Sequence, residues 1–146
     1  MTDYPPPART AYPVLQRIPT RWNDNDVYGH MNNVVYYEYF DTAVNRWLID
    51  AKALDVPHGP VVGLVAETNC RFTASLGFPD VLETGLSALR VGTSSVVYGL
   101  GLFREGHETA AAICRYVHVY VDSASRRPTP LPESFREALE TLRPPV

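Results

Sequence analysis

The sequence predicts an α+β fold in which one curved antiparallel sheet wraps around a long central helix. Three observations predict it. An uninterrupted helical pattern runs from Asn33 to about Ala53. Short connections that carry Gly, Pro, Asp or Ser separate the later segments, so consecutive segments are expected to pair antiparallel. Four β-rich segments cover about residues 61–74, 80–91, 95–105 and 109–122.

The chain begins with a segment that is predicted to form a proline-rich arm over residues 1–14, ahead of a single domain over residues 15–146. The run Pro5–Pro7 lacks backbone donors and favours an extended conformation. From Gln16 to Trp22 the pattern is β-rich but interrupted by Pro19, which suits a first or edge strand.

The central helix is predicted from apolar residues at steps of three and four, with no Pro or Gly among them. Further apolar residues, including Val35, Tyr36, Ala43 and Ile49, widen the apolar arc, so the helix is expected to be covered on much of its circumference. The segment PLPESFREALETL predicts a short C-terminal helix, because Pro stands at its entrance and Glu in its first turn. A single sheet leaves free edges, so we expect a homodimer or homotetramer.

Composition limits the function. The 146 residues are 45% hydrophobic and 20% charged, with no apolar run long enough for membrane insertion and no secretory signal pattern, so a soluble cytoplasmic protein is expected. The net charge of -3 and the lack of a basic block argue against a nucleic acid partner. Cys70 and Cys114 are interpreted as reduced buried thiols. His58, His107 and His118 lack ligand neighbours at useful spacing, are interpreted as surface or satisfied histidines, and predict no metal site.

The stretch RWNDNDVYGHMNN, residues 21–33, is the richest in polar chemistry. Asp24, Asp26 and Gly29 fall at positions one, three and six of a calcium-binding loop. Position five would be Tyr28 and position twelve Val35, which cannot replace the required oxygen ligands. Calcium is therefore rejected.

The run W-N-D-N-D-V-Y-G-H-M-N-N-V-V-Y-Y-E-Y-F resembles the hot-dog-fold acyl-CoA thioesterases of the 4-hydroxybenzoyl-CoA thioesterase type. The resemblance extends over roughly residues 15–140. It includes Gly92-Thr93-Ser94-Ser95 at a hairpin, the V-x-V-x-V-D end of the last strand, and Arg126-Arg127-Pro128. It implies a hot-dog fold and hydrolysis of an acyl-CoA substrate to free acid and CoA, with no cofactor.

The resemblance also implies catalytic roles. Asp26 matches the family's catalytic carboxylate, which acts as nucleophile or general base. The backbone N–H of Asn33, at the start of the helix, is a credible donor to the oxyanion. His30 either polarises the carbonyl or water, or fixes the loop by a hydrogen bond. Plant acyl-carrier-protein thioesterases carry Asn where Tyr28 stands here, so an Asp-Asn-His arrangement is not complete.

Other residues are candidates for substrate binding, each with a structural alternative. Asn32 is also a natural helix cap. Glu67 and Thr68 interrupt an apolar strand and are expected either to touch the thioester or to form a solvated face. Arg126 is either a phosphate contact or a solvated turn charge. Asp24 is interpreted as a turn or cap residue. The substrate-binding candidates are Tyr28, Asn32, Glu67, Thr68, Ser94, Ser95 and Arg126.

Three other functions stay open from the sequence. A thioesterase acting on acyl-carrier protein differs only in its partner, and the missing basic block weighs against it. A hydratase of the same fold needs an acid-base pair that the sequence does not identify. A non-catalytic hot-dog protein would bind an acyl-CoA without needing an ionised Asp26.

Overall fold

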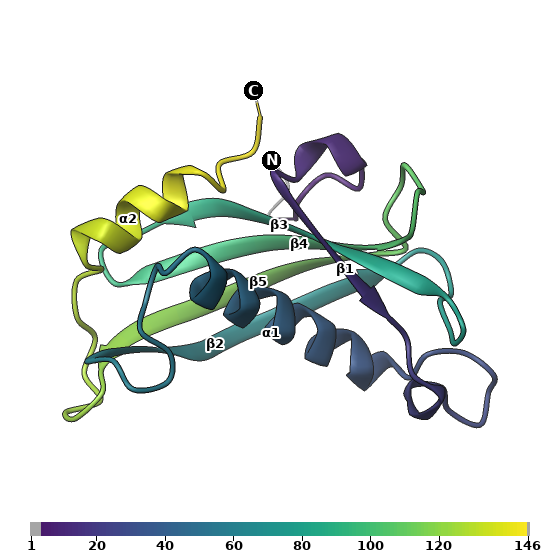
Figure 1. Cartoon of the computed structure of the whole chain (residues 1–146), viewed down its shortest axis with the longest axis horizontal. Helices are drawn as coiled ribbons and strands as arrows, with labels where there is room; N and C mark the ends of the chain where they lie inside the picture. The colour runs from purple at the N-terminus through teal and green to yellow at the C-terminus, as the bar shows by residue number, and fades with distance from the viewer. Residues whose placement is uncertain (1–3, 146) are drawn as a thin grey trace.

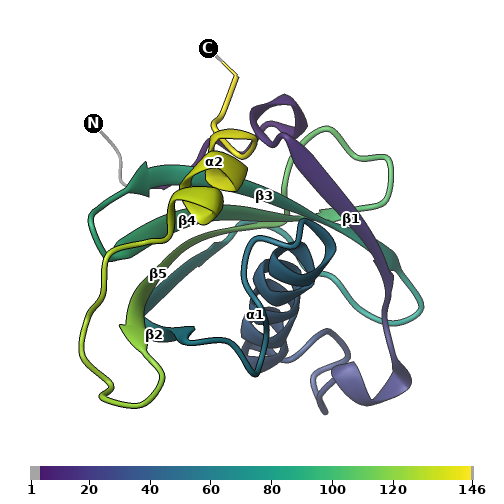
Figure 2. The ribbon, with the colours of Figure 1, turned by 60° about the vertical axis from the view of Figure 1, so that its left-hand side comes forward.

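The computed structural model describes residues 4–145, which form one five-stranded antiparallel sheet and two α-helices. The strand order is β1-β3-β4-β5-β2. The sheet curves over α1, which runs along its concave side (Figures 1 and 2). The elements are the 3₁₀ turns η1 (Arg9–Ala11) and η2 (Trp22–Asp24), strands β1 (Val14–Pro19), β2 (Val61–Phe72), β3 (Val81–Val91), β4 (Ser95–Arg104) and β5 (Ala112–Asp122), and helices α1 (Asn33–Asp50) and α2 (Glu133–Glu140).

The α+β arrangement predicted from the sequence is confirmed, with two corrections to its strands. The first strand covers Val14–Pro19 and not Gln16 to Trp22, because Pro19 cannot donate to the ladder and the chain turns into η2 after it. The segment 73–80 does not form a hairpin between β2 and β3. It crosses from one edge of the sheet towards the other, and Leu76 in its middle is buried in the core.

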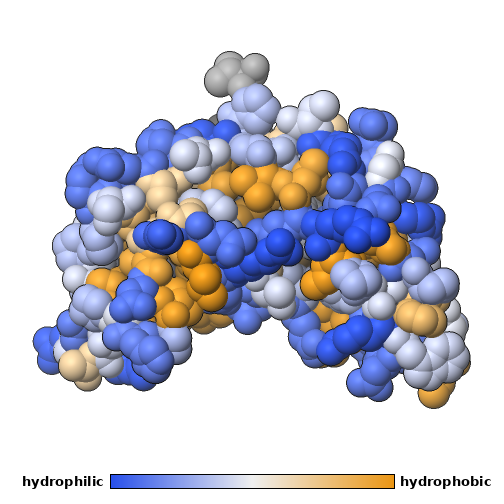
Figure 3. Space-filling model, viewed as in Figure 1, coloured by the Kyte–Doolittle hydropathy of each residue, from blue (hydrophilic) through white to orange (hydrophobic). Residues whose placement is uncertain are grey.

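Helix α1 covers the core with one face and presents the other to solvent. Its buried face packs on β3, β4 and β5, and Phe40 and Val44 are fully buried there. Of the residues from which the sequence predicts a helix covered on much of its circumference, Tyr36 and Ala43 are buried and Val35 is partly buried, whereas Ile49 is 54% exposed. In Figure 3 a hydrophilic band crosses this side of the molecule between apolar areas, and the lower outline is hollowed between two lobes.

The C-terminal helix α2 begins after Pro132, as predicted, and closes one end of the core. Phe135 is fully buried and meets the ring of Tyr120 edge to face at 4.9 Å. It also lies 6.4 Å from the ring of Trp47 on α1. The short helix therefore joins the sheet to the C-terminal half of α1.

The proline-rich N-terminal segment packs on the face of the sheet opposite α1. The Tyr12 ring lies over Gly85 and Gly101, where a Cβ on either glycine would come within 3.0 Å of it. The same ring meets Phe103 edge to face at 5.6 Å. Arg9 forms a bidentate ion pair with Glu83, with both N–O distances at 2.7 Å. These contacts make a second, smaller apolar cluster outside the main core.

Both cysteines are free thiols that face one another as register partners on β2 and β5. Cys114 is buried, and Cys70 is partly buried. Burial raises the pKa of Cys70 to about 12 and raises that of Cys114 further. Neither thiol is ionised near neutral pH.

Among residues 4–145, no helix combines the length and apolar character needed to cross a membrane.

Candidate active site

The stretch between β1 and α1 folds into a tight turn around Asp26. The Asp26 Oδ1 atom accepts a hydrogen bond from the Tyr28 N–H at 2.8 Å. The Gly29 N–H donates to the Asp26 carbonyl at 3.2 Å, and the Asp26 N–H donates to the His30 carbonyl at 3.0 Å. Gly29 takes a φ of +87°, which an L side chain rarely adopts. The turn thus fixes the carboxylate while using one of its oxygens.

Asp24 anchors this loop to the protein interior. Its side chain is fully buried and accepts hydrogen bonds from the Arg21 N–H at 2.8 Å, from the Arg21 guanidinium and from the Tyr39 hydroxyl on α1. Burial opposes ionisation of Asp24, but these hydrogen bonds outweigh it and lower the pKa of the carboxyl. Asp24 is therefore a buried structural carboxylate, in agreement with its interpretation from the sequence.

The far side of the loop is held by the segment 73–80. The Met31 N–H donates to the Leu76 carbonyl at 2.8 Å, and Met31 itself is buried. The Asn25 Oδ1 accepts from the Phe78 N–H at 3.0 Å. Because the loop is fastened at both ends, Asp26 lies on a supported turn and not on a free tip.

The first turn of α1 presents a backbone donor beside this loop. The Asn32 side chain caps the helix by accepting from the Val34 N–H at 3.0 Å, and the Asn32 carbonyl accepts from the Val35 N–H at 2.9 Å. The Asn33 N–H is the first in the helix and has no intrahelical acceptor. It therefore lies at the positive end of the helix dipole, where a developing negative charge is stabilised.

A cavity of about 380 Å³ brings Asp26, Tyr28, His30 and Asn33 together. Its lining also includes two aromatic side chains, Tyr36 and Phe72, which meet edge to face at 4.8 Å. The His30 ring lies near the Met31 carbonyl, with its Nδ1 3.4 Å from that oxygen. The remaining lining residues are Met31, Ala74 and Ser75.

The structure brings together only some of the residues that the sequence singled out. Glu67 lies on β2 and forms an ion pair with Arg115 at 2.9 Å, while Thr68 follows it on the same strand. Asn32 acts as a helix cap and is absent from the lining of the cavity. Phe72, Ala74 and Ser75 line the cavity but were missed, because the segment that carries two of them was read as a hairpin.

The hairpin residues Ser94 and Ser95 and the turn residue Arg126 lie at the opposite end of the sheet. Ser95 pairs with Val119, near the end of β5, whereas the cavity lies beside Phe72 at the other end of β2. A 12-residue strand such as β2 is about 36 Å long at ~3.3 Å per step. Within one chain these three residues therefore do not belong to the Asp26 cavity.

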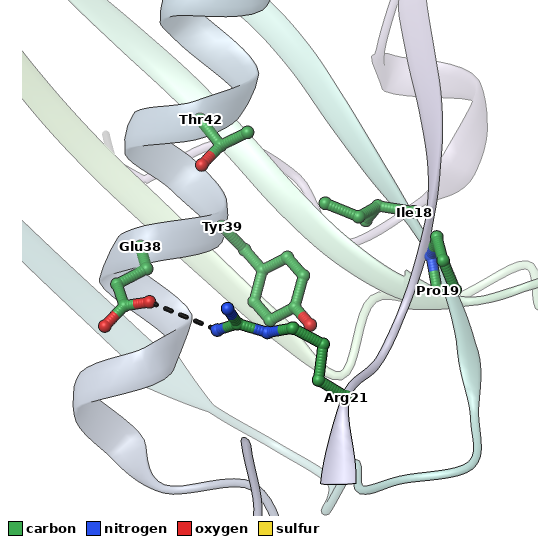
Figure 4. Close-up of a pocket in the computed structure, with 6 residues that line it drawn as sticks. All are labelled: Ile18, Pro19, Arg21, Glu38, Tyr39 and Thr42. Carbon is green, nitrogen blue, oxygen red and sulfur yellow. Dashed lines mark ion pairs between the residues drawn. The ribbon is translucent and has the colours of Figure 1, made fainter. Parts of the chain in front are cut away.

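On the other side of α1 a groove of about 330 Å³ separates the helix from β1 (Figure 4). Arg21 reaches across it towards Glu38 at 3.5 Å, and the Tyr39 ring forms part of its wall. Arg21 and Tyr39, the two residues that hydrogen-bond to the Asp24 side chain, both line this groove. No group of three or more His, Cys, Asp or Glu side chains suited to a metal ion occurs within residues 4–145.

Comparison with known proteins defines the class to which this fold belongs. The fold is the hot-dog fold, shared over nearly the whole chain with the PA5185 protein from Pseudomonas aeruginosa strain PAO1. The two proteins are 48% identical with a TM-score of 0.92, over 96% of this chain and 98% of that one. Residues 20–139 match the thioesterase-like superfamily, and the chain belongs to that superfamily.

More distant structures share the fold alone. Slr0204 from Synechocystis, a 1,4-dihydroxy-2-naphthoyl-CoA thioesterase, is 16% identical with a TM-score of 0.77, over 86% of this chain and 93% of that one. SAV2348 from Staphylococcus aureus, solved in complex with CoA, is 19% identical with a TM-score of 0.81, over 90% of this chain and 86% of that one. No curated protein matches the chain significantly.

Proposed function

We propose that the protein is an acyl-CoA thioesterase whose chemistry takes place in the Asp26 cavity. The observation that carries the proposal is the meeting of a carboxylate, Asp26, with the N-terminus of α1 at Asn33 in one cavity that two aromatic side chains also line. Hydrolysis of a thioester needs an oxygen nucleophile, donors for the oxyanion and a place for the acyl group. Membership of the thioesterase-like superfamily supports the same reaction class.

Asp26 supplies the carboxylate. The turn occupies its Oδ1 atom, and the second oxygen is the one that acts. This oxygen either attacks the thioester carbonyl, forming a mixed anhydride that water then hydrolyses, or removes a proton from a water that attacks the same carbon. In both routes the carbonyl oxygen becomes negative and the CoA thiolate leaves.

The Asn33 N–H stabilises that negative charge. It stands at the first turn of α1, where the aligned peptide dipoles of an 18-residue helix favour an anion. His30 lines the same cavity and fixes the loop through the Met31 carbonyl. The apolar wall formed by Tyr36 and Phe72 receives the part of the acyl group next to the thioester.

The choice of CoA as the carrier rests on a structural neighbour, and the location of its binding residues depends on a second copy of the chain. SAV2348 is a hot-dog neighbour in complex with CoA, which supports CoA as the carrier here. Strand β2 is an edge strand with Leu64, Val65 and Phe72 partly exposed, which favours pairing with a second copy in a homodimer or homotetramer. Ser94, Ser95 and Arg126 contribute to a CoA site only if they come from that second copy.

The test is release of free CoA thiol from a panel of short, long and aryl acyl-CoA esters, with Asp26→Asn measured in parallel. The native protein is expected to release thiol, and the variant to lose at least 100-fold in kcat while it still binds CoA. Asp50→Asn is the matched control, because Asp50 is an exposed carboxylate at the far end of α1 and should leave kcat unchanged.

Retention of activity in Asp26→Asn would move the chemistry to another group. A folded protein that binds acyl-CoA esters but releases no thiol from any of them would be a non-catalytic acyl-CoA-binding hot-dog protein. Hydrolysis of acyl-carrier-protein esters alone would replace CoA by the carrier protein as the substrate partner.

A further inference from the structure

The three most exposed large apolar side chains within residues 4–145 all lie on the loop between β1 and α1. Val27 is 94% exposed, Tyr28 80% and Trp22 78%. Phe78, on the segment between β2 and β3, is also exposed and meets the Trp22 ring edge to face at 5.8 Å. We call these four side chains the apolar tip. Exposed apolar side chains that gather at one place mark a contact with a protein or a membrane.

The apolar tip forms a projection at one end of the molecule. In Figure 1 the loop between β1 and α1 lies at the lower right, beyond the end of β1. In the same view of Figure 3, pale and orange atoms project at the lower end of that lobe. A protein partner needs a hollow that matches such a projection, whereas a lipid surface accepts projecting side chains of any outline. The shape therefore favours lipid.

The backbone of the tip pairs its polar groups within the protein. Five residues donate their N–H to an acceptor in the loop itself, namely Asp24, Asn25, Asp26, Tyr28 and Gly29. On the neighbouring segment the Phe78 N–H donates to the Asn25 Oδ1 atom, and Pro79 has no N–H. Unpaired backbone groups are costly to transfer from water into lipid. A tip that pairs them internally can enter a lipid interface without that cost.

The charges of the tip are also paired within the protein. Arg21 forms an ion pair with the buried Asp24, and Arg104 forms one with Asp80 at 3.3 Å. Arg21 is the only Lys or Arg in the stretches 21–31 and 73–80. The tip therefore offers no surplus of positive charge to anionic lipid headgroups. Its attraction to a membrane has to come from apolar contact, which zwitterionic lipid provides.

The residue types of the tip suit the boundary between water and hydrocarbon. Trp and Tyr are enriched at both interfaces of a membrane, because their rings are apolar while the N–H or O–H group stays near the headgroups. Phe78 and Val27 add side chains without any polar atom, which gain free energy when they leave water.

We propose that the apolar tip docks on a zwitterionic phospholipid bilayer, with its four side chains in the interfacial layer. Tyr28 belongs both to the tip and to the lining of the Asp26 cavity, so docking places that cavity beside the lipid. The docking claim does not depend on Asp26 or on hydrolysis.

The chain carries a natural probe for the first test. Trp22 is exposed, whereas the second tryptophan, Trp47, is only 6% exposed and packs against Phe135. Phosphatidylcholine vesicles should shift the emission of Trp22 to shorter wavelength, and phosphatidylcholine with brominated acyl chains should quench it. Trp22→Phe keeps an apolar ring and leaves Trp47 as the reporter, so it should float with vesicles but lose both signals.

Two results of this test would overturn the proposal. One is a native protein that does not float with phosphatidylcholine vesicles. The other is a shift and quenching that persist in Trp22→Phe, because the signal would then come from Trp47 and not from the tip.

Two aspartate variants locate the contact. Val27→Asp puts a charge into the tip, and the fold should persist because the Val27 side chain is almost fully exposed. Vesicle binding should weaken by about tenfold, since the burial of one Val side chain is lost. Ile49→Asp is the matched control, because Ile49 is an exposed apolar residue near the other end of α1 and should keep the native affinity. Equal losses in the two variants would refute the tip as the contact.

Salt and protein concentration separate docking from its rivals. Apolar docking should be nearly the same at low and high salt, because screening acts only on charges. Binding that needs anionic lipid and is released by salt would overturn the proposal in favour of electrostatic adsorption. If a second copy of the chain covers the tip, Trp22 emission changes with protein concentration and vesicles leave it unchanged. That result would likewise overturn docking on a bilayer.

Discussion

The Tyr39 hydroxyl on α1 donates a hydrogen bond to the buried carboxylate of Asp24, two residues before Asp26. This contact ties the loop that carries the candidate catalytic carboxylate to the helix whose N-terminus faces it. The loop and the helix therefore keep a fixed distance, which is what a preorganised site for a developing oxyanion requires.

Removing the Tyr39 hydroxyl should weaken the support of the Asp26 loop without changing any residue that lines the cavity. Tyr39→Phe leaves the Asp24 carboxylate with one hydrogen bond fewer in a buried position, and we expect a loss of about 1–3 kcal/mol in the free energy of unfolding. Urea denaturation measures this loss, and kcat should fall several-fold while KM changes little. Tyr37→Phe is the control on the same helix, because Tyr37 is not among the donors to Asp24. Equal effects of the two substitutions would show that the Asp24 contact has no special role.

The turn at Gly29 allows a test with a matched partner elsewhere in the chain. Gly29 and Gly106 both have a positive φ, of 87° and 80°, and neither would meet an atom within 4 Å if a Cβ were added. Alanine at either position should therefore cost a similar ~1 kcal/mol of stability through backbone strain alone. Only Gly29→Ala should also lower kcat/KM, because Gly29 closes the turn between Asp26 and His30. Equal loss of activity in both variants would argue against a catalytic role for the turn.

The buried His118 predicts a dependence of stability on pH. Its pKa is lowered to about 4 in the folded protein, against about 6.5 in the unfolded chain, so between these values the unfolded chain binds more protons. Its contribution is complete above about pH 6.5 and is lost as the pH falls towards 4, with a total on the order of 3 kcal/mol. Thermal or urea unfolding at pH 7 and pH 4.5 measures the slope. His118→Phe should flatten the slope in this window, and an unchanged slope would contradict the prediction.

The ion pair between Arg9 and Glu83 predicts a second acid-dependent effect. The Arg9 hydrogen bond lowers the pKa of Glu83 to about 2, from an ordinary value near 4.5. The stabilisation is therefore present above about pH 4.5 and is lost as the pH falls towards 2. Glu83→Gln should cost about 1–2 kcal/mol at pH 7 and speed cleavage of the N-terminal segment by a protease. A variant as resistant to the protease as the native chain would show that the pair does not hold the segment.

The sequence predicts the elements of this fold better than their pairing. The helical period of α1 and the alternation of the strands are local, so their bounds agree with the structure to within about two or three residues. The crossing of segment 73–80 depends instead on Leu76 meeting Met31, a contact between two parts of the chain that no local pattern reports. The expectation that consecutive strands pair antiparallel holds for β3, β4 and β5 and fails for β2.

The candidate site, too, could be predicted from the sequence only where its residues are neighbours along the chain. Asp26, His30 and Asn33 lie close together in the sequence, so one motif identified the group that the structure places in one cavity. Phe72 ends β2 and Ser75 follows that strand, and only the fold brings them there. The Tyr39 contact to Asp24 joins residues 15 positions apart. Spacing reports which face of a helix is buried but not which polar group its hydroxyl meets.

The slot that Gly85 and Gly101 form for the Tyr12 ring has a practical consequence for handling the protein. A recombinant chain that began after Tyr12 would leave this slot open beside Phe103 and would expose an apolar surface on the outer side of the sheet. Such a chain should precipitate at lower concentration than the full one. Purification tags are better joined to the C-terminus, since a bulky fusion at the N-terminus would be attached to the same segment as the Tyr12 ring that fills the slot.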